Sequence, residues 1–207
     1  MMSASATIAT ANRASVSEQS EEQKMVKKVA VSSFLGNFIE WFDYASYSYF
    51  ATTIALVFFP SDNHTVAMLQ TFGVFALSFV LRPIGALFWG NLGDKKGRKD
   101  ALAISIMFMS GASFLIGCLP SYAAIGIFAP VLLLLLRMVQ GFSASGEYAG
   151  AATFLGEYAP TKKRGIYCSL IPASTAIGLL AGSTLATVMT ASLSSDALTS
   201  WGWRIPF

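Results

Sequence analysis

Charged residues are scarce in this sequence. Lys, Arg, Asp and Glu make up 12% of its 207 residues, whereas apolar residues make up 54% and aromatic residues 13%. A soluble globular chain carries about 25% charged residues. The shortage of charge excludes a disordered chain and a protein that coats nucleic acid. We therefore expect a membrane protein whose partner is the lipid bilayer, with no nucleic-acid partner.

Cysteine and histidine are nearly missing as well. The chain has two cysteines and one histidine. Two cysteines are too few for a disulfide scaffold or a cysteine-rich metal site, and one histidine is too few for a histidine-based zinc centre. The sequence therefore predicts no metal site, no cofactor and no enzyme.

The first 28 residues lack a long apolar run and are rich in Ser, Thr, Ala, Gln and Glu. Such a segment buries too little apolar surface to offset the entropy lost on ordering. A signal peptide is not expected, because no basic start is followed by an apolar stretch of about 7 to 15 residues. The sequence predicts a disordered tail over residues 1–28, on the cytoplasmic side.

From residue 29 onward, long apolar runs alternate with short polar loops. A helix needs roughly 20 apolar residues to cross a bilayer, because each residue adds about 1.5 Å. The runs predict an all-α transmembrane bundle over residues 29–207, with five complete spans and part of a sixth. We expect the spans at about 29–59, 66–91, 101–119, 123–158 and 166–190, and a partial span from 203.

The basic residues predict how the bundle is oriented. Of the 14 Lys and Arg residues, 11 lie before the first span, between the second and third, or between the fourth and fifth. The alternate loops contain no Lys or Arg. Cytoplasmic loops carry the excess of basic residues in membrane proteins. The N-terminus is therefore expected in the cytoplasm.

Five ionisable residues fall inside the predicted spans. Each costs roughly 2.5 to 3.5 kcal/mol at the centre of a bilayer, so they are expected to face the interior of the bundle. They either pair to hold helices together or form a pathway for a solute and protons. Their number favours the pathway. The five are Glu40, Asp43, Arg82, Arg137 and Glu147.

The first span carries a polar and aromatic face. Glu40, Asp43, Tyr44 and Tyr47 are spaced by three, four and seven residues, so a helix places them on one side. Two carboxylates one turn apart repel each other in a medium of low dielectric constant, which favours proton uptake by one of them. The tyrosines lie deep in the span, which favours a cavity wall over a belt at the membrane surface.

The loop between the second and third spans resembles a known signature. Residues 90–99 read GNLGDKKGRK, which matches the G-x-L-[AG]-D-[RK]-x-G-R-[RK] pattern of the major facilitator superfamily at every specified position. The run RMVQG (137–141) resembles that superfamily's fourth-helix motif, whose arginine is associated with proton coupling. The chain is therefore similar to proton-coupled members of this superfamily.

Other segments resemble one family within the superfamily, the metabolite:proton symporters. Two of them, GEYAGA and EYAPTKKRG, look most like its proline/glycine-betaine branch. The resemblance extends from about residue 29 to the last residue. The segments are GNFIEWFDY (36–44), RPIG (82–85), QGFSASGEYAGA (140–151), EYAPTKKRG (157–165) and WGWRIPF (201–207).

The resemblance implies a fold of two six-helix halves with a solute site between them near the midplane of the membrane. This chain would be the N-terminal half, truncated in the sixth helix, and its partner would be a C-terminal half. The cytoplasmic gating motif would comprise Gly90, Gly93, Asp94, Gly97 and Arg98, with Asp94 and Arg98 engaging the opposite half.

The implied activity is proton symport of a small zwitterionic metabolite such as proline or betaine, across the bacterial inner membrane. The arginine of the fourth span would attract a carboxylate, the two tyrosines would contact a quaternary ammonium, and one of the three acids would carry the coupling proton. Two alternatives stay open: a dicarboxylate (2-oxoglutarate-like) symporter, and a non-transporting remnant or partner of a separate second half. The implied pathway residues are Glu40, Asp43, Tyr44, Tyr47, Arg82, Arg137 and Glu147.

Overall fold

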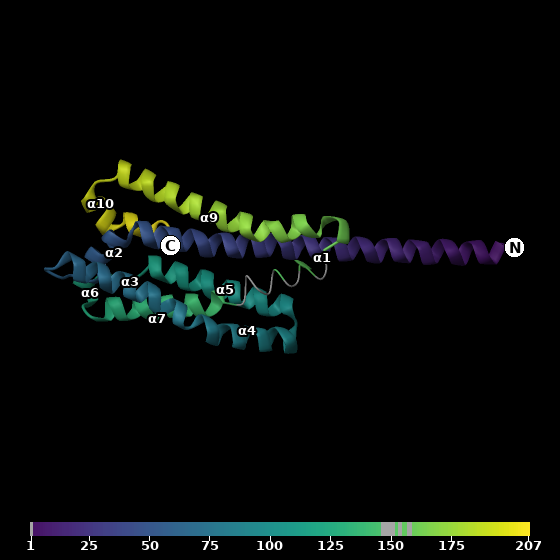
Figure 1. Ribbon diagram of the computed structural model, residues 1–207, viewed down its shortest axis with the longest axis horizontal. Coiled ribbons are helices and arrows are strands. Elements are labelled where there is room, and N and C mark those ends of the chain that lie inside the picture. The colour runs from purple at the N-terminus through teal and green to yellow at the C-terminus, as the bar shows by residue number, and fades with distance from the viewer. Residues whose placement is uncertain (1, 146–151, 153–154, 157–158) are drawn as a thin grey trace.

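The computed structural model describes residues 2–145, 152, 155–156 and 159–207. Within these residues the secondary structure consists of helices and contains no strand, which confirms the all-α class (Figure 1). The long helices run side by side along one axis, and α9 lies along α1 (Figure 1). In chain order the elements are α1 (Met2–Tyr49), α2 (Ala51–Phe58), α3 (His64–Val80), α4 (Arg82–Lys96), α5 (Arg98–Gly117), α6 (Tyr122–Ile125), α7 (Phe128–Ala144), η1 (Thr161–Lys163), α9 (Arg164–Ser192), α10 (Ser195–Ser200) and η2 (Gly202–Arg204).

The N-terminal segment differs from the prediction. The backbone of residues 2–28 continues α1, whereas the sequence predicts a disordered tail there, and this part of α1 extends beyond the rest of the bundle (Figure 1). No glycine or proline occurs before Gly36. Ala, Gln, Glu and Lys, which are common in this segment, have high helix propensity. Local propensity is therefore the physical reason for a helix here.

Two of the predicted spans are interrupted by short breaks. The first span is α1 followed by α2, with the N–H of Phe50 still bonded to Ser46 O at 2.9 Å. The second is α3 followed by α4, with Leu81 at the break. Pro83 has no N–H to donate to the preceding turn, which explains why the helix breaks at this point. The break brings Arg82 to the first position of α4.

A single residue connects α4 to α5. Gly97 has a φ of +99°, a conformation that favours glycine because a Cβ would be strained there. Its N–H donates to Gly93 O at 3.0 Å and closes the last turn of α4. The loop predicted between the second and third spans is therefore a sharp reversal at one glycine.

Glycines allow the helices to approach closely. A methyl group at Gly178 of α9 would lie 2.7 Å from Phe38 O of α1, and one at Gly182 would lie 2.8 Å from Phe42 O. A methyl group at Gly141 of α7 would lie 1.9 Å from Ser78 O of α3. These contacts leave no room for a side chain, so the backbones of α1 and α9, and of α3 and α7, are in direct contact.

The C-terminal residues pack against the end of the bundle. Trp203 is fully buried, and its ring meets Phe58 of α2 edge-on at 5.2 Å between centroids. Arg204 Nη2 donates to Leu119 O at 3.0 Å, beyond the end of α5. The structure therefore places η2 against α2 and α5, and the partial span expected from residue 203 stays a prediction.

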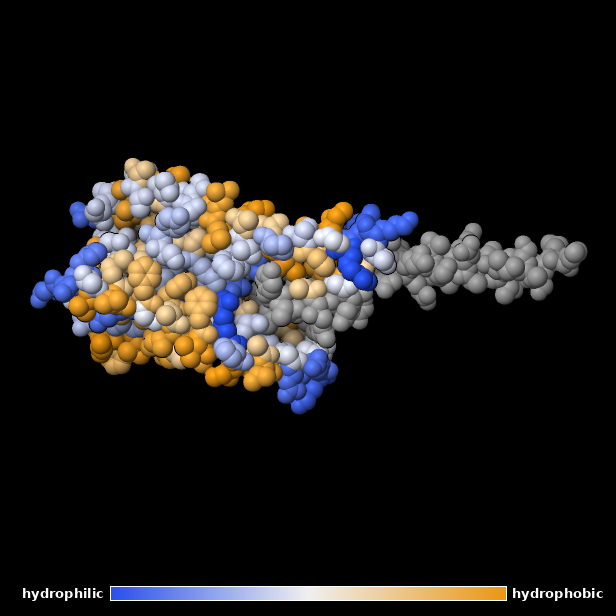
Figure 2. All heavy atoms as spheres, in the orientation of Figure 1, coloured by the Kyte–Doolittle hydropathy of each residue, from blue (hydrophilic) through white to orange (hydrophobic). Residues whose placement is uncertain are grey.

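The outer surface of the bundle is apolar. Leu69, Leu87 and Phe114 are 68%, 78% and 66% exposed. Hydrophobic residues cover much of the flank, and strongly hydrophilic residues gather towards the ends (Figure 2). In the part of the chain that the structure describes, three helical stretches are long and apolar enough to cross a membrane: His64–Lys96, Lys99–Gly117 and Thr161–Ser192.

Candidate functional site

Asp43 of α1 and Arg137 of α7 form an ion pair in the interior of the bundle, with side chains that are 6% and 1% exposed. Asp43 Oδ1 also accepts hydrogen bonds from Ser113 Oγ of α5 at 3.4 Å and from Gln140 Nε2 at 3.3 Å. Gln140 Nε2 donates to Ser113 Oγ at 2.6 Å. A buried ion pair needs such additional bonds to offset the loss of hydration. We call these four residues the buried cluster.

Arg137 has a second neighbour on α1. Its guanidinium carbon lies 3.9 Å from the centroid of the Tyr47 ring, within the range of a cation–π contact. The Tyr47 hydroxyl donates to Thr71 O of α3 at 2.9 Å. Among the described residues, Arg137 Nε and Nη2 have no hydrogen-bond acceptor. The guanidinium carbon also lies 5.4 Å from the ring centroid of Phe207. The guanidinium is therefore held by one ion pair and two rings, with two of its donors buried and unpartnered among the described residues.

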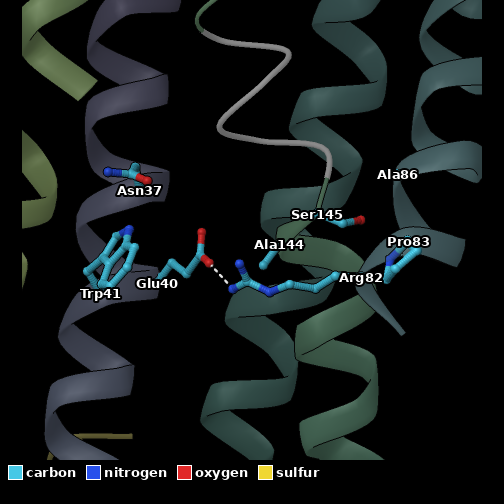
Figure 3. A pocket seen from close by; sticks show the side chains of 8 residues that line it. All are labelled: Asn37, Glu40, Trp41, Arg82, Pro83, Ala86, Ala144 and Ser145. Carbon is cyan, nitrogen blue, oxygen red and sulfur yellow. Dashed lines mark hydrogen bonds and ion pairs between the residues drawn. The ribbon is translucent and has the colours of Figure 1, made fainter. Parts of the chain in front are cut away.

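A second ion pair joins Arg82 of α4 to Glu40 of α1. Arg82 Nη2 bonds to Glu40 Oε1 (Figure 3). It also bonds to the Tyr44 hydroxyl. The Glu40 side chain is 4% exposed and the Arg82 side chain 29%. The guanidinium carbon of Arg82 also lies 4.6 Å from the ring centroid of Phe79 and 5.3 Å from that of Tyr44. Arg82 thus reaches from the break in the second span to α1.

The second ion pair borders a cavity of about 500 Å³ between α1, α4 and α7, which we call the charged pocket. Glu40 and Arg82 point towards each other and meet at its wall (Figure 3). A cavity with one acid and one base on its wall can hold a molecule that carries both charges. Its lining residues are Asn37, Glu40, Trp41, Arg82, Pro83, Ala86, Ala144 and Ser145.

The structure gives each of the two acids in the predicted first span its own arginine. Glu40 pairs with Arg82, and Asp43 pairs with Arg137. The repulsion expected between the two carboxylates is therefore offset by opposite charges. Both tyrosines expected to contact a quaternary ammonium already face an arginine. Glu147, the third acid of the predicted pathway, lies outside the described residues.

The predicted gating motif lies at the junction of α4 and α5. Gly90 lies within α4, Gly93 is buried, Asp94 is exposed, Gly97 forms the reversal, and Arg98 is the first residue of α5. Its engagement with an opposite half stays a prediction.

Some polar residues of the interior were not predicted. Asn37 Nδ2 lies 3.0 Å from Ile171 O, 2.8 Å from Ser174 Oγ and 2.8 Å from Thr175 Oγ1, and so links α1 to α9. Asn37 precedes Glu40 by one turn, and Gln140 follows Arg137 by one turn. Their position one helical turn from a charged residue could have indicated that Asn37 and Gln140 face the interior. Ser113 offers no comparable signal.

Comparisons with known proteins identify the chain's relatives. Residues 28–207 match the family model described as "Sugar (and other) transporter". The chain is 43% identical over 182 residues to a proline/betaine transporter of Salmonella typhimurium. It is 42% identical over 182 residues to a glycine betaine/proline/ectoine/pipecolic acid transporter of Dickeya dadantii, and 43% identical over 187 residues to a putative proline/betaine transporter of Staphylococcus aureus.

These alignments cover most of this chain but a minor part of each relative. They include 88% of this chain and 36% of the Salmonella and Dickeya proteins, and 90% of this chain and 40% of the Staphylococcus protein. The chain thus spans somewhat more than a third of the length of the relatives it matches.

A solved structure shares the fold. The proton:xylose symporter XylE of the major facilitator superfamily, bound to 6-bromo-6-deoxy-D-glucose, superposes with a TM-score of 0.76 at 16% identity. The match covers 89% of this chain and 42% of that one. The chain belongs to the sugar (and other) transporter family and has the fold of the N-terminal half of a major facilitator superfamily protein.

Proposed function

We propose that this chain forms the N-terminal half of a proton-coupled symporter for a small zwitterionic solute of the proline and betaine type. The relatives in Salmonella, Dickeya and Staphylococcus carry the names of proline and betaine transporters. The charged pocket has an acid and a base on one wall, which suits a zwitterion better than a dicarboxylate. The dicarboxylate alternative has no support in the names of these relatives.

The proton would bind within the buried cluster. The ion pair of Asp43 with Arg137 is the observation on which the proposed coupling rests. Arg137 stays charged at any physiological pH. Gln140 and Ser113 do not titrate, so Asp43 is the member of the cluster that can change its charge. A proton on Asp43 leaves the buried charge of Arg137 without its partner, which is costly in an apolar interior. Such a state favours rearrangement of the helices, as coupling requires.

The solute would bind in the charged pocket. Arg82 is partly exposed there and donates through Nη2 alone, with Nε unpartnered among the described residues. A solute carboxylate would bind the exposed part of the Arg82 guanidinium. Glu40 would supply the negative charge for the cationic end. The open side of the pocket would be closed by a C-terminal half, since solutes bind between the halves of this fold.

The membrane would be the bacterial inner membrane, with the N-terminus in the cytoplasm. The junction of α4 and α5 and the start of α9 lie at one end of the bundle, whereas α2, α6 and α10 meet the other end (Figure 1). The basic residues of the loops lie at the first of these ends. The positive-inside rule assigns that end to the cytoplasm.

A chimera tests the proposed function. The 207-residue chain is joined in frame to the C-terminal half of the Salmonella typhimurium relative, purified and reconstituted in liposomes. We expect uptake of labelled betaine that rises when the outside is acidified and stops when a protonophore removes the gradient. No gradient-driven uptake, under conditions in which the intact relative is active, would contradict the proposal.

A further inference from the structure

A second cavity lies next to the charged pocket, between α1, α3 and α9. Its volume is about 580 Å³, and we call it the aromatic pocket. Trp41 lines both cavities, so the two are neighbours on either side of one side chain. The aromatic pocket is lined by Trp41, Tyr44, Ala45, Ser48, Tyr49, Phe75, Phe79, Leu179, Leu180 and Ser183.

The rings of this pocket form one connected group. Tyr44 lies 5.8 Å from Trp41, 5.5 Å from Phe75 and 5.6 Å from Phe79, measured between ring centroids. Phe79 is 38% exposed, whereas Tyr44 is 8% exposed. Packing among the rings therefore fixes their positions and leaves part of Phe79 accessible to a ligand.

The aromatic group already holds a cation, which is part of the chain itself. The guanidinium carbon of Arg82 lies 4.6 Å from the centroid of Phe79 and 5.3 Å from that of Tyr44. Both distances are within about 6 Å, the range in which a ring face attracts a positive charge. The two rings therefore lie within cation–π range of an arginine whose own charge is paired with Glu40.

A zwitterion with a quaternary ammonium offers a charge of the right sign at each end of this arrangement, although its ammonium has no N–H to replace the hydrogen bond from Arg82 to the Tyr44 hydroxyl. Its carboxylate can replace Glu40 as the partner of Arg82, and its ammonium can replace the guanidinium on the rings. Glu40 then becomes the counter-charge of the ammonium. Each positive charge keeps one negative partner through the exchange, so no buried charge is left alone.

We infer that Phe79 and Tyr44 form the binding site for the quaternary-ammonium end of a zwitterionic solute, and that Arg82 occupies this site as a resident cation until the solute binds. The inference rests on the proposed function and specifies the site at which the solute is recognised. It assigns solute recognition to Phe79, and it explains why an arginine stands one turn beyond that ring.

This exchange predicts selectivity for both charges. Choline carries the ammonium without a carboxylate, so it cannot draw Arg82 away from the rings. The compound 3,3-dimethylbutanoate has the shape and carboxylate of betaine with carbon in place of nitrogen, so it gains nothing from the rings. Both compounds are expected to bind about tenfold more weakly than betaine.

The test is a binding measurement in lipid nanodiscs on the chimera described above, which supplies the second half of the solute site. Saturation-transfer NMR of the methyl protons gives relative affinities for betaine, choline and 3,3-dimethylbutanoate. The variant Phe79→Leu is expected to lower betaine affinity to that of the dimethylbutanoate. Phe88→Leu is the matched control, because Phe88 is 51% exposed on α4 and lines neither pocket. It is expected to retain the wild-type preference for betaine.

Three results would overturn the inference. They are the absence of betaine binding to the wild-type chimera, equal binding of betaine and 3,3-dimethylbutanoate, and a preference for betaine that survives in Phe79→Leu. The proposed function is tested separately by gradient-driven uptake in the chimera. If the chimera transports betaine and Phe79→Leu leaves the preference unchanged, the assigned site is wrong and the function stands. If the preference depends on Phe79 and no uptake occurs, the site stands and the function is wrong.

Discussion

The guanidinium carbon of Arg137 lies 3.9 Å from the centroid of the Tyr47 ring, and Tyr47 in turn donates its hydroxyl to Thr71 O. Arg137 belongs to α7, Tyr47 to α1 and Thr71 to α3. The ring covers one face of a charge whose edge is bonded to Asp43. Three helices therefore fix the position of one buried charge, so a change in that charge acts on all three.

Neutralising the pair of Asp43 and Arg137 separates its structural role from its role in coupling. Arg137→Ala leaves a buried carboxylate without its partner and is expected to destabilise the bundle by roughly 3 to 5 kcal/mol. The double variant Asp43→Asn with Arg137→Gln removes both charges and is expected to recover most of that stability. Thermal unfolding in detergent measures this. In the chimera, the double variant is expected to show no gradient-driven uptake. Uptake at the wild-type level would mean that the pair serves helix packing and not coupling.

Gly141 is expected to be intolerant of any side chain. A methyl group there would lie 1.9 Å from Ser78 O, so Gly141→Ala forces α7 away from α3 and is expected to destabilise the chain by about 1 to 3 kcal/mol. Gly111 is a matched control within α5, because a methyl group at that position meets nothing within 4 Å. Gly111→Ala is expected to leave the unfolding temperature unchanged or to raise it. Equal effects of the two substitutions would show that the contact is unimportant.

The orientation of the bundle can be tested by labelling in intact cells. Cys118 and Cys168 are free cysteines and are first replaced by serine. Cysteines introduced at Asn63 and Asp196 are expected to react with an impermeant maleimide applied from outside, because their loops carry no basic residue. A cysteine at Lys96 is expected to react only after the cells are opened. The reverse pattern would place the N-terminus outside.

The chain by itself is expected to insert into the membrane without transporting. It covers 42% of the length of the superfamily member whose structure it resembles, and alternating access requires two halves that rock about a shared site. Its abundance is expected to rise when the C-terminal half of the Salmonella relative is expressed in the same cells. Quantitative immunoblotting of membrane fractions measures this. Gradient-dependent betaine accumulation by the chain alone would mean that two copies of it make a working transporter.

The interior charges were predictable from the sequence, but their partners were not. Glu40 and Asp43 stand in an apolar run, and burial of an ionisable group in such a run is expensive enough to place both in the interior. Which arginine each acid meets depends on the rotation and tilt of α1 against α4 and α7. Tertiary packing sets those angles, and no local pattern records them.

The backbone shows the same division between local and tertiary signals. The break that positions Arg82 follows from the missing N–H of Pro83, and the reversal between α4 and α5 follows from the positive φ that Gly97 can adopt. Both effects are properties of a single residue type. The link from Asn37 to Ser174 joins residues 137 positions apart. It arises only when α9 packs along α1, so no pattern in the sequence indicates the partner of Asn37.

Proton coupling at the pair of Asp43 and Arg137 can be measured directly as the movement of protons together with the solute. The chimera is placed in lightly buffered liposomes with a pH-sensitive dye outside, and betaine is added to the outside without an imposed gradient. Inward symport is expected to raise the external pH as betaine enters. In Asp43→Asn, betaine is still expected to exchange across the membrane, measured as counterflow of label, while the external pH stays constant. Betaine entry without any pH change in the wild-type chimera, or an unchanged proton signal in Asp43→Asn, would contradict coupling at the pair of Asp43 and Arg137.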